Sequence, residues 1–178
     1  MFHGWDNYFF MVGSAAASLI GLLFVVVTLT QGRERTAAMR GARIYMTPLA
    51  IHFAAVLVDS AVCVVPNLST EMAAVIFLIC ALVGLVNALQ TCFGIRGLAT
   101  KADPPHWSDI WWYGLTPATV HIALIVISAG FWFGASWAVP AIAATLMVLL
   151  LAGIRNAWDL VTWIAPGSGA ALPPVDQP

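Results

Sequence analysis

Long apolar segments alternate with short polar segments along the whole chain. A membrane-spanning helix needs about 20 mostly apolar residues to cross a hydrocarbon layer of about 30 Å. Five segments meet this requirement, and they cover residues 8–30, 44–65, 72–95, 111–131 and 137–154. The pattern therefore predicts an all-α, polytopic membrane bundle of five transmembrane helices that forms one domain over residues 1–164. The Pro- and Gly-rich segment 165–178 is expected to be a disordered tail.

The positions of the basic residues predict how this bundle is oriented. With five spans, all seven basic residues fall on one side of the membrane: Arg33, Arg35, Arg40, Arg43, Arg96, Lys101 and Arg155. Basic residues in short loops remain on the cytoplasmic side of a membrane. We therefore expect the N-terminus outside and the C-terminus in the cytoplasm. Tryptophans near both ends of the predicted spans agree with this arrangement, because indole rings favour the interface.

Composition narrows the classes of function. The 178 residues are 61% apolar and 8% charged, whereas soluble domains contain about 45–50% apolar and about 25% charged residues. This composition excludes a soluble enzyme. Seven basic against eight acidic residues leave no excess positive charge for a nucleic-acid partner. The sequence contains no nucleophile elbow, P-loop, zinc-protease or dinucleotide-binding motif, which disfavours an enzyme but leaves open an intramembrane site built from scattered polar residues.

Five polar residues inside the predicted spans are the candidate functional residues. His52 and Asp59 lie in the second span, Asn87 and Gln90 in the third, and His121 in the fourth. An ionised Asp at the centre of a span costs about 2.5–3.5 kcal/mol even on a lenient scale, so ionisable groups there indicate an ion or proton path by default. Asp59 follows His52 by seven residues and shares its helix face. We expect Asp59 to be protonated, paired or hydrated, with Asn87 and Gln90 as its polar neighbours.

The two histidines occur in a repeated local pattern. A Thr-Pro dipeptide at residues 47–48 precedes His52, and a second one at residues 116–117 precedes His121 at the same spacing. Thr-Pro is typical of a helix start, with Thr as N-cap and Pro at the first helical position. Both histidines are expected at a similar height in the cytoplasmic half of the membrane. They are candidates for a structural hydrogen bond, for a proton relay, or for the two axial ligands of a b-type haem; no other cofactor and no metal site is expected.

The first span contains small residues four positions apart. Gly13, Ala17 and Gly21 share one helix face, and such a face lets another helix approach closely. The sequence leaves open whether that helix belongs to the same chain or to a second copy. The surrounding stretch from Phe9 to Val25 resembles the opening of many small bacterial membrane proteins of unknown function. This resemblance implies a multi-pass protein of the bacterial cytoplasmic (inner) membrane.

Three classes of function remain after these exclusions. The first is a proton or small-solute channel or transport component, built as an oligomer around Asp59, His52, His121, Asn87 and Gln90. The second is a structural or regulatory subunit that binds a larger membrane complex and has no catalytic role. The third is a haem-binding membrane protein. The lipid bilayer is the expected surrounding in all three, with a second copy or a partner complex as the further partner.

Overall fold

The computed structural model describes residues 2–30, 36–98 and 107–164, and every described element is helical. The elements are α1 (Asp6–Thr30), α2 (Thr36–Val64), α3 (Thr70–Leu98), α4 (Trp107–Asp109), the π-helix η1 (Ile110–Leu115), α5 (Thr116–Trp132) and α6 (Ala138–Ile164). The elements α4, η1 and α5 follow one another without a break. The predicted tail over residues 165–178 lies outside the described residues.

The prediction of five long apolar helices is confirmed. Five stretches are long and apolar enough to cross a membrane: Asp6–Thr28, Tyr45–Val64, Thr70–Gly97, Trp107–Trp132 and Ala138–Thr162. Several helices extend beyond the predicted spans, most clearly at the beginning of α2 and at the end of α6. When a helix continues past its apolar segment, the backbone N–H and C=O groups at the end of that segment keep their hydrogen-bond partners. The helices therefore do not end at the first polar residues.

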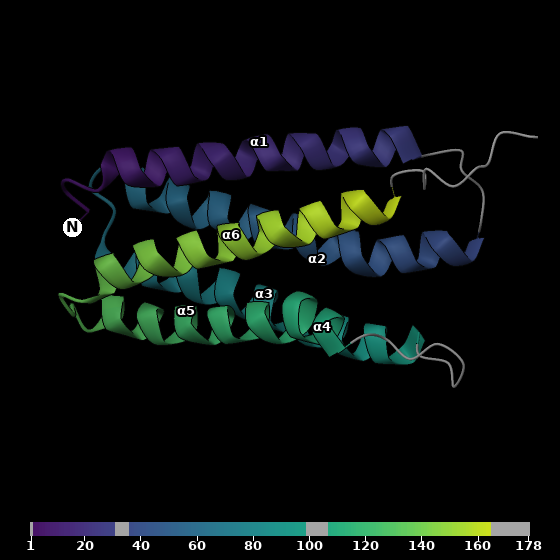
Figure 1. Ribbon diagram of the computed structural model, residues 1–178. Coiled ribbons are helices and arrows are strands. Elements are labelled where there is room, and N and C mark those ends of the chain that lie inside the picture. Colours follow the sequence, from purple (N-terminus) through teal and green to yellow (C-terminus); the bar gives the residue numbers. More distant parts are fainter. Residues whose placement is uncertain (1, 31–35, 99–106, 165–178) are drawn as a thin grey trace, which may run out of the picture.

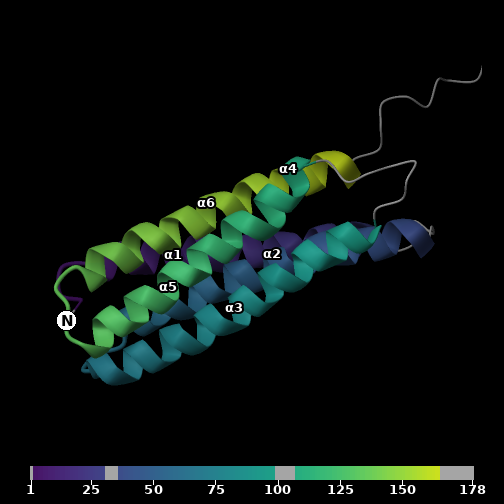
Figure 2. The same ribbon diagram turned by 90° about the horizontal axis from the view of Figure 1, so that it is seen from below.

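Four of the long helices form a bundle, and α1 packs on its outside. The helix α3 packs against both α2 and α5, and α6 packs against the same two helices. This arrangement puts α2 and α5 at opposite corners of the bundle. The helix α1 lies along α2 and α6, and all five long helices run nearly side by side (Figures 1 and 2).

The buried face of α1 differs from the predicted small-residue face. It consists of Phe9, Val12 and Ala16. Gly13 also packs inward, since a Cβ atom at this position would lie 3.1 Å from Cβ of Ser60 on α2. Ala17 and Gly21 are exposed instead, with no atom within 4 Å of the Cβ position of Gly21. Large apolar side chains such as Phe9 bury more area against the bundle than small residues would, which explains why this face of α1 turns inward. A close contact of Ala17 and Gly21 with a second copy stays a prediction.

The two Thr-Pro dipeptides have different structural roles. The helix α2 continues through Pro48, so the interpretation of this dipeptide as a helix start is wrong. Pro117 does lie in the first turn of α5, but the preceding residues form the π-helical turn η1. Proline has no N–H group and its ring crowds the carbonyl group four residues earlier. A π-helical turn is one way in which a helix accommodates such a disruption.

Candidate functional site

The structure brings His52 and His121 together in the centre of the bundle. Their ring centroids are 5.6 Å apart, with an angle of 43° between the ring planes. His52 is 2% exposed and His121 is fully buried. Because α2 and α5 occupy opposite corners, the two side chains reach across the interior of the bundle to meet. The pair lies at one height, as the equal spacing from the two Thr-Pro dipeptides predicts.

A glycine on the neighbouring helix α3 makes room for this pair. A Cβ atom at Gly84 would overlap the Cε1, Nε2 and Nδ1 atoms of the His121 ring. The nitrogen-bearing edge of the imidazole therefore lies directly against the backbone of α3. Any larger residue at position 84 would push the ring away or move the two helices apart.

Three of the four ring nitrogens of the pair lack the partners that buried polar groups normally have. Among the described residues, Nε2 of His52 and both ring nitrogens of His121 make no hydrogen bond. A buried donor or acceptor without a partner costs about 1–3 kcal/mol. The fold therefore keeps polar groups at its centre at a cost to its stability, which is unusual unless they serve a function.

Asp59 forms a second group of buried, unpartnered atoms on the same helix face. It is fully buried, and within the described part of the chain no nitrogen or oxygen donor pairs with its carboxyl oxygens, nor does Oγ of Ser60 have a hydrogen-bond partner. The thiol groups of Cys63 and Cys80 lie close enough to interact with its carboxyl group. Asp59 is seven residues from His52, which is about 10 Å along the axis of α2.

The two predicted amide neighbours of Asp59 have different positions on α3. Asn87 is partly buried, and its Oδ1 atom is buried without a hydrogen-bond partner among the described residues. It follows Gly84 by three residues, about 5 Å along the helix, so it lies near the histidine pair rather than near Asp59. Gln90 is exposed on the surface of the bundle. The structure thus gathers four of the five predicted residues in the interior.

A second polar cluster, which the sequence analysis did not predict, lies where η1 meets the beginning of α5. Thr116 donates its backbone N–H to the carbonyl of Trp111, five residues earlier. The next carbonyl, that of Trp112, would pair with the nitrogen of Pro117, which carries no hydrogen. Nδ2 of Asn156 on α6 donates to this carbonyl at 2.9 Å. Asn156 is only 1% exposed, and its side chain satisfies an acceptor that the proline leaves free.

The remaining members of this cluster are also partnered. The hydroxyl group of Tyr113 donates to the carbonyl oxygen of Asn156 at 2.9 Å and to Oδ2 of Asp159 at 3.2 Å. Nη1 of Arg155 donates to Oδ1 of Asn156 at 3.2 Å, and the guanidinium group stacks over the Trp112 ring at 4.6 Å. A proline inside a helical segment was the one sequence signal for this cluster, because it predicts a free carbonyl that needs a donor.

The geometry of the histidine pair bears on whether it could hold haem. Two imidazoles from opposite helices are a ligand set that haem iron uses. Here, however, the nitrogen-bearing edge of His121 lies against Gly84, so the backbone of α3 occupies the space beside the ring that a macrocycle would need. The residues as arranged do not fit this group. No cluster of three metal-ligating side chains occurs in the described part of the chain either.

A comparison of this chain with protein-family models, with curated proteins and with solved structures finds no match.

Proposed function

We propose that this chain is an integral membrane protein that conducts protons through the interior of its four-helix bundle, with the His52–His121 pair at the centre of the path. The single observation that carries the proposal is the contact between these two buried rings, since Nε2 of His52 and both ring nitrogens of His121 have no hydrogen-bond partner among the described residues. Histidine exchanges protons near neutral pH more readily than any other side chain.

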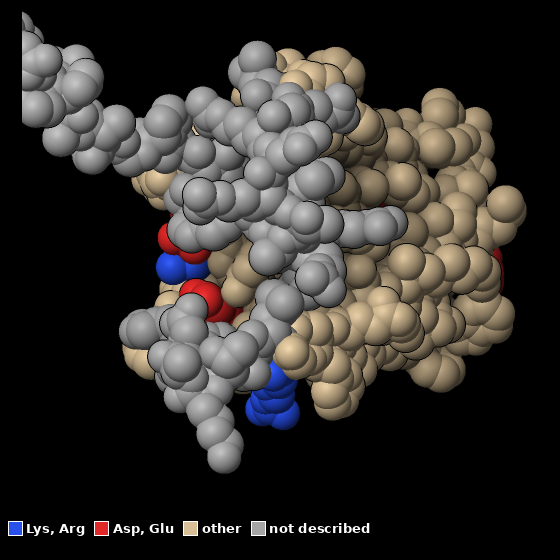
Figure 3. Space-filling view, turned by 90° about the vertical axis from the view of Figure 1, so that its right-hand side faces the viewer, with Lys and Arg blue, Asp and Glu red and all other residues tan. Residues whose placement is uncertain are grey.

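The surface of the bundle supports insertion into a bilayer. Large apolar side chains are widely exposed on several helices, among them Phe10, Phe24, Phe93 and Val126. Soluble monomers rarely expose large apolar areas, whereas such side chains are stable in contact with lipid. Charged side chains lie on the end of the molecule where α1 finishes and α2 begins (Figure 3). The excess of basic residues at this end supports a cytoplasmic location for it in a bacterial inner membrane.

The unpartnered polar groups are distributed along the bundle as a path requires. Asp59 is five residues from the end of α2 at Val64, about 8 Å along the helix axis. The histidine pair lies about 10 Å further in, and Asn87 lies about one helical turn beyond Gly84 toward the cytoplasmic end. Water molecules that enter between these groups would complete their hydrogen bonds and would connect them for proton transfer.

Proton flux into liposomes tests this proposal. The purified protein would be reconstituted with a pH-sensitive dye inside the vesicles, and flux would be driven by a potassium diffusion potential. We expect the wild type to exceed empty liposomes, and His52→Leu and His121→Leu to abolish the excess. The control is His3→Leu, which removes an exposed histidine before α1 and should leave the flux unchanged. Wild-type flux equal to that of empty liposomes would overturn the proposal.

Two observations on the same sample separate the other classes of function. A Soret absorption band that disappears in His121→Ala would show a haem protein, which the Gly84 contact argues against. A partner complex that co-purifies with the chain, together with an absence of flux, would favour a non-catalytic subunit. The exposed face with Ala17 and Gly21 would then be the first surface to test for the partner.

A further inference from the structure

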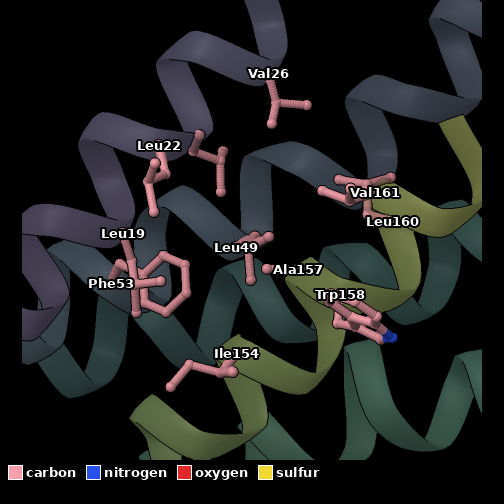
Figure 4. A pocket seen from close by; sticks show the side chains of 11 residues that line it. Leu19, Leu22, Val26, Leu49, Phe53, Ile154, Ala157, Trp158, Leu160 and Val161 are labelled. Carbon is pink, nitrogen blue, oxygen red and sulfur yellow. The ribbon is translucent and has the colours of Figure 1, made fainter. Parts of the chain in front are cut away.

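An apolar groove runs along the outside of the four-helix bundle, between α1, α2 and α6. Its volume is about 210 Å³, and its walls include Leu22 and Val26 on α1, Phe53 on α2, and Ala157 and Trp158 on α6 (Figure 4). The only polar side-chain atom among the lining residues is the indole nitrogen of Trp158. The groove is therefore suited to a hydrocarbon chain and offers almost no hydrogen bonds to a polar ligand.

The groove lies in the half of the bundle that carries the basic residues. Val26 is four residues before the end of α1, and the lining residue Val161 is three residues before the end of α6. These two helices end on the side where α2 begins. If the chain is oriented as its arginines predict, the groove faces the cytoplasmic leaflet, at the depth of lipid acyl chains.

The charge at this end indicates the headgroup of the lipid. Four arginines and one glutamate occur between residues 33 and 43. Arg40 and Arg43 lie in the first turns of α2, nine and six residues before the lining residue Leu49, or about 14 and 9 Å along the axis. They are therefore at the level where the headgroup of a lipid would lie if its acyl chain filled the groove. Four arginines within 11 residues of the sequence, next to an apolar helix long enough to cross a membrane, favour anionic lipids.

We propose that the groove binds one acyl chain of an anionic phospholipid from the cytoplasmic leaflet. The proposal rests on the membrane insertion and orientation proposed above, but not on proton conduction. The bound chain would replace side-chain contacts that α1 lacks along its second half, where Leu22 is 60% exposed. It would also contact Phe53, which packs against Gly153 on α6 and directly follows His52 in the sequence.

Lipid retained through purification tests the proposal. The protein would be extracted in mild detergent from membranes containing phosphatidylglycerol and phosphatidylethanolamine, and analysed by native mass spectrometry. We expect about one retained phosphatidylglycerol per chain. Ala157→Phe, which fills the groove, should abolish retention. The control Ala144→Phe places the same ring at an exposed position of α6 away from the groove and should retain the lipid.

A second variant and a charge variant keep the test decisive if Ala157→Phe does not fold. Leu22→Trp narrows the groove from an exposed position and should reduce retention several-fold. Arg40→Gln combined with Arg43→Gln should remove the preference for phosphatidylglycerol over phosphatidylethanolamine. Occupancy by detergent alone, equal retention in Leu22→Trp, or a wild type without headgroup preference would each overturn the proposal. Because retention and proton flux are separate measurements, loss of one leaves the other proposal standing.

Discussion

The bundle buries two polar clusters, and they differ in how far their hydrogen bonds are satisfied. Around Asn156, the side chains of Tyr113, Arg155 and Asn156 all have partners on a neighbouring element or residue. Around the histidine pair, seven buried side-chain atoms have none among the described residues, counting those of Asp59, Ser60 and Asn87. The same fold can therefore satisfy a buried polar group where structure alone requires it. This difference is the basis of our proposal that the second cluster serves a function, whereas the first one stabilises the fold.

The largest loss of stability is expected when the satisfied cluster is broken. Asn156→Ala leaves the Trp112 carbonyl without its donor and the Arg155 guanidinium without one acceptor. We expect the free energy of unfolding to fall by about 2–3 kcal/mol, because unpaired buried groups cost about 1–3 kcal/mol each. Unfolding by SDS in mixed micelles, followed by circular dichroism, measures this change. Asn7→Ala, at an exposed position of α1, is the control and should change little.

The next largest effect is expected where α3 meets the histidine ring. Gly84→Ala places a methyl group where the His121 imidazole lies, and overpacking of this kind costs about 1–3 kcal/mol. The same unfolding assay measures the cost. Gly97→Ala, also on α3 but with no atom within 4 Å of its Cβ position, should not destabilise the protein. If both variants unfolded alike, the close contact between α3 and the ring would be disproved.

Replacing a member of the unpartnered cluster should cost little. His52→Leu substitutes an apolar side chain of similar size for a ring whose Nε2 atom has no partner. Removing an unsatisfied polar atom is neutral or stabilising, by up to about 1–3 kcal/mol. The free energy of unfolding should therefore stay constant or rise. A fall as large as that of Asn156→Ala would mean that His52 is a structural residue, and the contrast between the two clusters would disappear.

The smallest change in stability is expected at Asp59. Asp59→Asn keeps the size and the polar character of the side chain, so the free energy of unfolding should change by less than about 1 kcal/mol. Proton flux should nevertheless fall to the level of empty liposomes, since the amide group of Asn does not release a proton near neutral pH. Flux equal to that of the wild type would remove Asp59 from the path and leave the histidine pair alone.

The helices could be predicted from the sequence because each apolar segment has about the length that a helix needs to cross a bilayer. The common height of His52 and His121 followed from their equal spacing after two prolines. Their contact could not be predicted, because it depends on which helices occupy opposite corners of the bundle. The exposure of Gln90 was missed for a related reason: α3 is apolar on all sides, so periodicity does not show which face is buried.

Neither the close approach at Gly84 nor the role of Asn156 could be read from the residues alone. Glycines in apolar helices are common, and only the packing of α3 against α5 shows which one faces a ring. Asn156 lay just beyond the predicted fifth span, 39 residues from Pro117 in the sequence. The free carbonyl of Trp112 connects these two distant positions, because the π-helical turn pairs Thr116 with Trp111 and the nitrogen of Pro117 has no hydrogen to donate.

The most direct test of the histidine pair is proton flux through a folded protein that lacks both imidazoles. The double variant His52→Leu/His121→Leu would first be shown by circular dichroism to have the helix content and unfolding midpoint of the wild type or higher. It would then be reconstituted beside the wild type at equal protein-to-lipid ratio. We predict flux above empty liposomes for the wild type and none for the double variant; equal rates from the two proteins would contradict a path through this pair.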